Sequence, residues 1–478
     1  MRKYLLLVIA ALFMVFAAGC VDLFAVPGVA VSPDGGQIYF LGGNFSMTGG
    51  DNSNSTLSLS SANVSDGTSK VIVAGSTDSQ ISAFAVNPTN GEVAYVTTTK
   101  AGESGVSIYG TDGSSRQLVG KDAFGGLMSG TMMAFSKDGS KIALTGLLFP
   151  PEVTPAMLED SNSDKITPEL IAKIKNVAWL INVADGSVKT ISNPDTERTN
   201  TIAWSPSGNL IAFNAWVDTN GDGTVSSAGI SGIPGMSAAA PTTSDLSEVH
   251  IYDVGSGSTV KVQATGLSFA PVFFSDSTVG YVTGDALSMM GGAGGGSGSG
   301  FGIATADVAS GASTPFYSAS NLITGVSVSP DGSQVAWAEV DSSGAAGASQ
   351  GGSMPPAKIF VSPLGTAAAK QVAELNGMFL VDVPVWTPDG KAVFVSSTNV
   401  LASVMGGLGS MMGGMTTTTE ATAEAPKPQQ VTWVDVGSGE TKVVYEGGML
   451  NSGMFASLMS LAGIQGLDSM MGAGAGGS

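Results

Sequence analysis

Residues 326–338 read VSVSPDGSQVAWA, two short alternating apolar stretches joined by Pro330, Asp331 and Gly332. An apolar residue at every second position predicts a half-buried β-strand on each side of the joint. Pro presets φ at the first turn position, Asp bonds its own backbone, and Gly accepts a positive φ. The stretch therefore predicts a β-hairpin with a tight turn.

The same pattern occurs seven times along the chain. Its copies are VAVSPDGGQIYF from Val29, FAVNPTNGEVAYV from Phe84, MAFSKDGSKIALT from Met133, IAWSPSGNLIAF from Ile202, VFFSDSTVGYV from Val272, VSVSPDGSQVAWA from Val326 and PVWTPDGKAVFV from Pro384. The third and fifth copies lack the turn Pro and have Lys137 and Asp276 there. Each unit ends with a second hairpin, such as WLINVADGSVKTI from Trp179, so a unit holds four strands, A to D.

Seven four-stranded units predict an all-β fold, a seven-bladed β-propeller of antiparallel blades. The alternative is a ring of six or eight blades. The A–B signature resembles the WD40-like (PD40) repeat of TolB and of the propellers attached to some serine peptidases, over roughly residues 27–447. That resemblance implies the fold and leaves the function open, because the scaffold hosts many functions. The first strand is innermost in blade one and the last is outermost in blade seven, so we expect closure by side-chain packing or by the tail from Met449.

Composition excludes several classes of function. The 478 residues carry 19 Lys+Arg against 38 Asp+Glu, a formal net charge of −19, which gives no electrostatic footprint for nucleic acid. A single Cys rules out an intramolecular disulfide framework and a Cys-rich zinc site. We expect a monomer.

Residues 1–20 read MRKYLLLVIAALFMVFAAGC, with a basic start, an apolar stretch and small residues before Cys20. This layout predicts a secretory signal peptide. The ending AAGC resembles the lipobox of bacterial lipoproteins, which implies lipidation of Cys20 and anchoring on the extracytoplasmic side of a membrane, the outer membrane if the host has one. The organisation is then a signal peptide (1–19), a tether (20–26), the propeller (27–447) and a Gly/Met-rich tail (448–478).

Long insertions occur at one place in the repeat, between strands B and C. They cover residues 43–55, 147–176, 216–246, 284–300, 341–356 and 399–428. In an antiparallel blade the B–C and D–A connections share one face, and the A–B and C–D turns share the other. We therefore expect the insertions to crowd a single face and to form the binding surface for another envelope protein or an extracellular polymer.

Methionines gather in these insertions. The clusters are Met289, Met290, Met405, Met411, Met412 and Met415. Flexible, polarizable thioethers suit a conformable apolar patch for a partner, or a Cu(I) site, since soft ligands select that ion. The third interpretation is a Gly/Ser/Met linker without a ligand.

Two insertions carry oxygen ligands in a calcium-like spacing. DTNGDGTV places Asp218, Asn220, Asp222 and Thr224 at the odd positions of an EF-hand-like loop. Gly229 stands at position twelve in place of the bidentate Glu, so another segment must complete the site. DSNSD is a weaker candidate. Its ligands would be Asp160, Asn162 and Asp164. Ca²⁺ is the one cofactor this sequence suggests, and an Asp-rich turn closed by its own side chains is the alternative.

Signals for catalysis are few. The single histidine, His250, lies in the alternating stretch VHIYDV, where a packed strand histidine is expected rather than a general base. One G-x-S-x-G sequence occurs, GASQG from Gly347, but it lies within the Gly/Ser/Ala-rich insertion 341–356 and not at the strand-to-helix turn that forms the nucleophile elbow of a serine hydrolase. We expect a non-catalytic binding platform. The alternative is a hydrolase or lyase that uses carboxylates at the mouth of the propeller channel.

Overall fold

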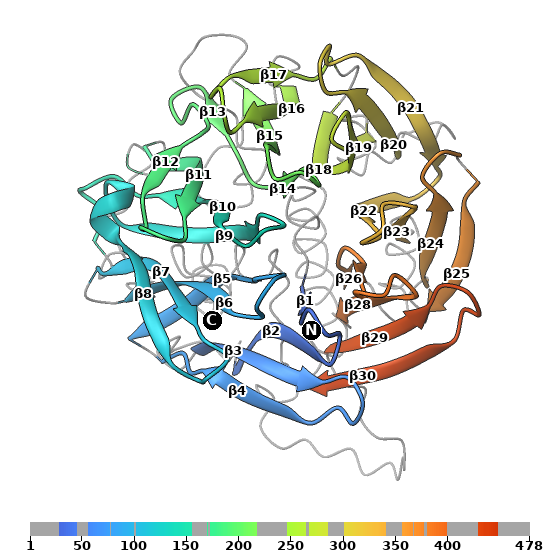
Figure 1. Ribbon diagram of the computed structural model, residues 1–478, viewed down its shortest axis with the longest axis horizontal. Helices are drawn as coiled ribbons and strands as arrows, with labels where there is room; N and C mark the ends of the chain where they lie inside the picture. Colours follow the sequence, from blue (N-terminus) through green and yellow to red (C-terminus); the bar gives the residue numbers. More distant parts are fainter. Residues whose placement is uncertain are drawn as a thin grey trace, which may run out of the picture.

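The seven repeats form seven antiparallel sheets arranged in a ring, a seven-bladed β-propeller, as the sequence predicts (Figure 1). The computed structural model describes residues 28–44, 56–76, 78–99, 102–154, 170, 173–217, 246–263, 267–284, 301–340, 356–366, 368–376, 380–398 and 429–447. Within these ranges, no helix is long and apolar enough to cross a membrane.

Each blade runs outward from the channel in chain order, except that the innermost strand of blades 4 and 7 is split in two. Blade 1 comprises β1 (Ala30–Val31), β2 (Gln37–Asn44), β3 (Thr56–Asn63) and β4 (Ser69–Val73). Blade 2 comprises β5 (Ser79–Val86), β6 (Val93–Thr99), β7 (Ser104–Tyr109) and β8 (Ser115–Gly120), followed by the 3-10 turn η2 (Lys121–Phe124). Blade 3 comprises β9 (Met128–Phe135), β10 (Lys141–Leu148), β11 (Lys175–Asn182) and β12 (Val188–Thr190).

Blades 4 to 7 complete the ring. Blade 4 comprises β13 (Glu197–Arg198), β14 (Ile202–Trp204), β15 (Leu210–Val217), β16 (Leu246–Asp253) and β17 (Thr259–Lys261). Blade 5 comprises β18 (Leu267–Ser275), β19 (Thr278–Gly284), β20 (Phe301–Asp307) and β21 (Ser313–Ala319). Blade 6 comprises β22 (Leu322–Val328), β23 (Gln334–Val340), β24 (Ala357–Pro363) and β25 (Lys370–Leu375). Blade 7 comprises β26 (Leu380–Val381), β27 (Val385–Trp386), β28 (Ala392–Thr398), β29 (Gln429–Asp435) and β30 (Thr441–Gly447).

The innermost strand is interrupted in blades 4 and 7 because its backbone amides find other partners or are missing. In blade 4 the Oδ1 atom of Asn214 accepts hydrogen bonds from the backbone amides of Asn200 (3.2 Å) and Thr201 (2.7 Å). In blade 7 Pro384 stands in the gap between β26 and β27 and has no N–H to offer the ladder.

The A–B turns follow the chemistry that their sequence predicts, with one addition. Gly332 has φ +72°, and the Asp331 Oδ1 atom accepts a hydrogen bond from the amide of Ser333. The residue before the turn Pro also takes part, because the hydroxyl of Ser329 donates to Asp331 Oδ1 at 2.6 Å and accepts the amide of Gln334 at 3.0 Å. The hydroxyl thereby locks both ends of the hairpin.

Blade 5 lacks this turn chemistry and uses a shorter turn. Ser275 pairs directly with Thr278, so only two residues connect the strands. The freed carboxylate of Asp276 accepts a hydrogen bond from the amide of Ser207 at 2.9 Å, in the neighbouring turn of blade 4. The missing Pro therefore reflects a turn that joins two blades.

The hydrophobic core is divided among the interfaces between blades. Each of the seven interfaces has its own cluster of buried apolar side chains, and the one between blades 7 and 1 includes Val29, Phe40, Phe394, Val431 and Val444. Among the strands that the structure describes, β1 is innermost in blade 1 and β30 is outermost in blade 7, so none of them is shared across this interface.

Packing and side-chain hydrogen bonds close the ring. The rings of Phe40 and Tyr445 lie 4.4 Å apart, centroid to centroid. The Lys442 ammonium donates to the backbone carbonyls of Ser65 (3.0 Å) and Val64 (3.4 Å). Blades 1 and 7 are thus held together by the same kind of contact as the other blades.

Candidate functional site

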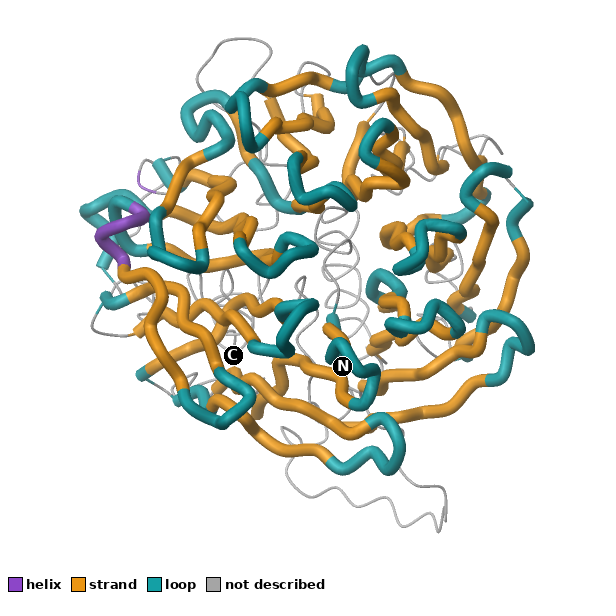
Figure 2. The backbone as a smooth tube through the Cα atoms, in the orientation of Figure 1, coloured by secondary structure: helices purple, strands orange, loops and turns teal. Residues whose placement is uncertain are grey.

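A cavity of about 500 Å³ lies in the central channel, between the inner strands of blades 1, 2, 3 and 7. Its wall is formed by Val29, Ala30, Val31, Ser32, Pro33, Leu41, Ser82, Ala83, Phe84, Ala85, Val86, Pro88, Thr131, Met132, Met133, Ala134, Phe135, Pro330, Val385, Trp386 and Pro388. Four of these are exposed turn prolines, so the cavity opens on the face of the A–B turns. Figure 2 shows these turns gathered around the channel.

The cavity wall is apolar, and its few polar groups already have partners. The Ser82 hydroxyl accepts the amide of Gly130 at 3.1 Å, and the Thr131 hydroxyl bonds that of Thr145 at 2.9 Å. The residues that line it include no carboxylate, histidine or cationic side chain. General acid–base chemistry needs such groups within hydrogen-bond reach of a substrate, so the wall itself supplies no general acid or base.

Three carboxylates stand at the rim of the cavity, each directly after a lining proline. They are Asp34, Asp331 and Asp389, which follow Pro33, Pro330 and Pro388. The hydroxyls of Ser32, Ser329 and Thr387, followed by backbone amides, hold the pKa of these three carboxyls below the ordinary value, that of Asp331 at about 2. The rim therefore stays negatively charged at every physiological pH.

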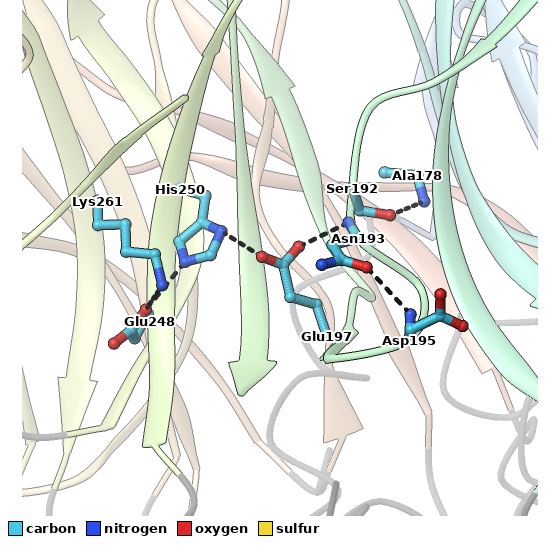
Figure 3. Close-up of polar contacts among 8 residues, drawn as sticks. All are labelled: Ala178, Ser192, Asn193, Asp195, Glu197, Glu248, His250 and Lys261. Carbon is cyan, nitrogen blue, oxygen red and sulfur yellow. Dashed lines mark hydrogen bonds and ion pairs between the residues drawn. The ribbon is translucent and has the colours of Figure 1, made fainter. Parts of the chain in front are cut away.

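The single histidine lies in a polar network on blade 4, on the side of the B–C connections (Figure 3). His250 on β16 is 1% exposed, its Nε2 lies 2.9 Å from Glu248 Oε2, and its Nδ1 faces Glu197 Oε1 at 3.4 Å. Lys261 Nζ approaches Glu248 at 3.4 Å, and the amide of Asn193 donates to Glu197 at 3.0 Å. A carboxylate only accepts hydrogen bonds, so the Nε2 atom carries a proton in this contact.

This network stabilises blade 4 and does not present a general base. The imidazole is shielded from solvent and packs edge-on against Phe213 at 5.6 Å, so no substrate atom reaches it. The hydrogen bond from His250 holds the pKa of the Glu248 carboxyl below its ordinary value. The packed strand histidine expected from the sequence is what the structure shows.

We predict that Glu248→Gln lowers the free energy of unfolding by about 1 kcal/mol at neutral pH, because it removes a charge-assisted hydrogen bond. The pKa of Glu248 is lower in the folded chain than in the unfolded chain, where it is about 4.5. The stability that the ionised carboxylate contributes is therefore fully present above the unfolded pKa and is lost as the pH falls through the folded pKa. Urea unfolding at pH 3 and 7 measures this, with Glu440→Gln at an exposed turn as control. A deficit that did not shrink between pH 7 and pH 3 would contradict the prediction.

A buried acid lies at the interface between blades 7 and 1. Asp382 is 5% exposed, hydrogen-bonds Ser396, and lies so close to Gly28 that a Cβ there would overlap its Oδ2 atom. Burial raises the pKa of this carboxyl to about 7, against the smaller opposing effect of Ser396. It does not belong to the lining of the cavity.

The sequence-predicted ligand residues lie outside the described residues. This applies to Cys20, to the calcium candidates Asp218, Asn220, Asp222 and Thr224, to the weaker set Asp160, Asn162 and Asp164, and to all six clustered methionines. Among the residues that are described, no three His, Cys, Asp or Glu side chains come together as a metal site. The predicted lipidation, calcium and methionine sites are therefore untested by the structure and stay predictions.

Sequence reasoning missed the cavity and its rim. The signal for the rim was present, because Ser/Thr-Pro-Asp-Gly occurs in blades 1, 6 and 7, whose turn aspartates become the rim. The apolar wall had no comparable signal, since alternating residues of an inner strand look alike whether they face another blade or the channel.

Comparisons with known proteins support the fold. In sequence, no protein-family model and no curated protein matches the chain. Its structure is similar to an oligogalacturonate lyase in complex with manganese (12% identity, TM-score 0.50, covering 78% of this chain and 85% of that one) and to a prolyl endopeptidase (11%, 0.50, covering 95% and 53%). It is also similar to TolB from Acinetobacter baumannii, at 15% identity and a TM-score of 0.39, covering 73% of this chain and 65% of TolB. The chain thus spans about two thirds of TolB and about half of the endopeptidase.

Proposed function

We propose that this chain is a non-catalytic lipoprotein of the bacterial cell envelope whose propeller serves as a binding platform. In this proposal Cys20 carries the lipid anchor, and the B–C insertions supply the recognition surface for another envelope protein or an extracellular polymer. A Ca²⁺ ion at Asp218, Asn220 and Asp222 would stiffen one insertion, and the Met clusters would add an adaptable apolar contact.

One observation carries the proposal: the B–C insertions leave and return at one face of a rigid ring. Asn44 pairs with Thr56, Val217 with Leu246, Gly284 with Phe301 and Thr398 with Gln429, so each insertion begins and ends at directly opposed residues. The A–B and C–D turns on the other face are short. A rigid scaffold with long connections on one face is typical of binding proteins. The buried histidine and the uncharged cavity wall support a role without catalysis.

The paired strand ends allow a direct test. Because a two-residue Asn-Gly turn joins directly opposed antiparallel residues, residues 218–245, 285–300 or 399–428 can each be replaced by Asn-Gly. We expect each variant to keep its β-sheet circular dichroism, and at least one to lose a partner recovered with the wild-type chain by cross-linking in its own membranes and mass spectrometry. A chain with 285–300 replaced by a Gly/Ser segment of equal length is the control for loop length. Unchanged recovery in all three variants would overturn the proposal.

A further inference from the structure

The face of the A–B turns lies opposite the strand ends at which the B–C insertions begin and end, and it carries its own candidate binding site. The channel cavity opens there, and its volume of about 500 Å³ falls within the range of ligand-binding pockets. The buried apolar side chains of its wall come from four blades, and they include Leu41, Ala83, Met133 and Trp386. The indole of Trp386 is fixed by a hydrogen bond to the carbonyl of Ser327 at 3.3 Å, so the wall is preorganised.

The charge at the mouth is negative and fixed. Asp34, Asp331 and Asp389 each use Oδ1 to accept a hydroxyl of their own turn, at 2.5, 2.6 and 2.6 Å. These hydrogen bonds hold the aspartates in place. The A–B turns of this face also carry Lys391, whose Nζ lies 4.0 Å from Asp389 Oδ2, and Lys137, which helps to lower the pKa of Asp276. The site therefore combines an apolar cavity with a carboxylate rim.

We propose that this mouth binds a polypeptide segment that inserts an apolar side chain into the cavity and places Lys or Arg side chains against the rim aspartates. Charge complementarity favours a cationic ligand over an anionic one. The wall favours an apolar ligand over a carbohydrate, because its side chains are mostly apolar and the hydroxyls of Ser82 and Thr131 each already take part in a hydrogen bond, so most hydroxyls of a buried sugar would be left without a partner. A polypeptide presents both chemistries on adjacent residues.

Three synthetic peptides test this chemistry on the full chain by isothermal titration calorimetry. The first has Leu-Phe between two Lys-Lys pairs, the second replaces every Lys with Glu, and the third replaces Leu-Phe with Ser-Ser. We expect the first to bind at least tenfold more tightly than either of the others, and its affinity to fall severalfold from low to high salt, since exposed charge pairs are screened. Equal binding of the Glu peptide or of the Ser peptide would overturn the proposal.

Substitutions then locate the site. Ala134 and Ala30 line the cavity and are half-buried, so Ala134→Phe or Ala30→Phe fills it, and each should weaken the Lys-flanked peptide at least tenfold. Ala309→Phe, at an exposed C–D turn of the same face, is the matched control and should leave the affinity unchanged. The triple variant Asp34→Asn, Asp331→Asn, Asp389→Asn keeps its Oδ1 acceptors, so it should fold, bind about tenfold more weakly and lose its salt dependence.

The remaining outcomes separate this inference from the proposed function. The Asn-Gly replacements of the B–C insertions should leave peptide affinity unchanged, so either proposal can fail while the other stands. Tetrabutylammonium ion has the apolar and cationic character without a peptide backbone. If it bound as tightly as the Lys-flanked peptide, the mouth would be a small-molecule site and the polypeptide assignment would be wrong.

Discussion

Replacing Trp337 with Ala is expected to lower the free energy of unfolding by about 5 kcal/mol, near the upper end for a buried aromatic residue. The side chain is 0% exposed on β23 and lies between blades 5 and 6. Its ring stacks on Phe360 at 5.7 Å and 11° and contacts Tyr317 at 4.8 Å. Truncation leaves a cavity among aromatic rings that the rigid sheets cannot close.

The loss of a hydrogen bond to Glu339 adds to the destabilisation that the cavity causes in Trp337→Ala. The indole N–H of Trp337 lies 3.2 Å from Glu339 Oε1, and the Glu339 side chain also accepts the hydroxyl of Tyr317 (2.8 Å) and the amide of Asn321 (3.3 Å). Glu339 is 4% exposed, so removing one of its donors leaves a buried carboxylate with fewer hydrogen bonds.

Trp337→Phe separates the two contributions, because it keeps a ring and removes the N–H. We expect a loss of about 2 kcal/mol for this variant, measured by urea unfolding followed by circular dichroism. A loss below about 2 kcal/mol for Trp337→Ala itself would show that the interface between blades 5 and 6 repacks, which the prediction does not allow.

The fold could be predicted from the sequence because its determinants are local and repeated. Each hairpin is specified by a few adjacent residues, as at Pro330, Asp331 and Gly332, and seven copies leave little choice of architecture. The two repeats whose A–B turns lack Pro, the third and the fifth, differ from each other in the structure. Asp276 marks a two-residue turn, whereas Lys137 keeps the common turn, in which Gly139 has φ +71°.

The sites depend on contacts between blades, which periodicity does not encode. Asp382 stands in the stretch VDVPVW with nothing to mark it as buried, and its neighbour Gly28 comes from the opposite end of the chain. The cavity wall likewise combines residues from blades 1, 2, 3, 6 and 7. Sequence predicted that recognition belongs to the B–C face, and the structure adds a second surface on the face of the A–B turns.

The two faces differ in how binding would be organised. The B–C face would recognise its partner through long insertions, while the A–B face offers a cavity of fixed shape with charges held by hydrogen bonds. A preorganised site loses less conformational entropy on binding than long loops do. In these two proposals together, the propeller holds a partner at the B–C face and a polypeptide segment at the cavity of the A–B face.

Asp382→Asn is expected to stabilise the protein by up to about 4 kcal/mol at pH 8 and by almost nothing near pH 3.5. Burial at the interface of blades 7 and 1 raises the pKa of this carboxyl from 3.8 to about 7. A difference of about 3 pKa units corresponds to roughly 4 kcal/mol.

The sign follows from which state holds the proton. Below pH 3.8 the carboxyl is protonated in both folded and unfolded chains, so it contributes nothing. Between 3.8 and about 7 the unfolded chain releases its proton while the folded chain retains it, so stability falls with rising pH. Above about 7 the folded state holds a buried charge, which the hydrogen bond with Ser396 compensates only in part. The isosteric amide is neutral throughout and avoids this loss.

Urea unfolding of both chains at pH 3.5, 6 and 8 gives the difference directly. Asp66→Asn is the matched control, because Asp66 is exposed in a C–D turn and the hydroxyl of Thr68, followed by its amide, holds the pKa of that carboxyl below its ordinary value. Its difference from the wild type should therefore stay constant between pH 6 and 8. A gain for Asp382→Asn that did not grow over this interval would mean that the carboxyl is solvated, and hence that the interface between blades 7 and 1, which none of the described strands bridges, admits water.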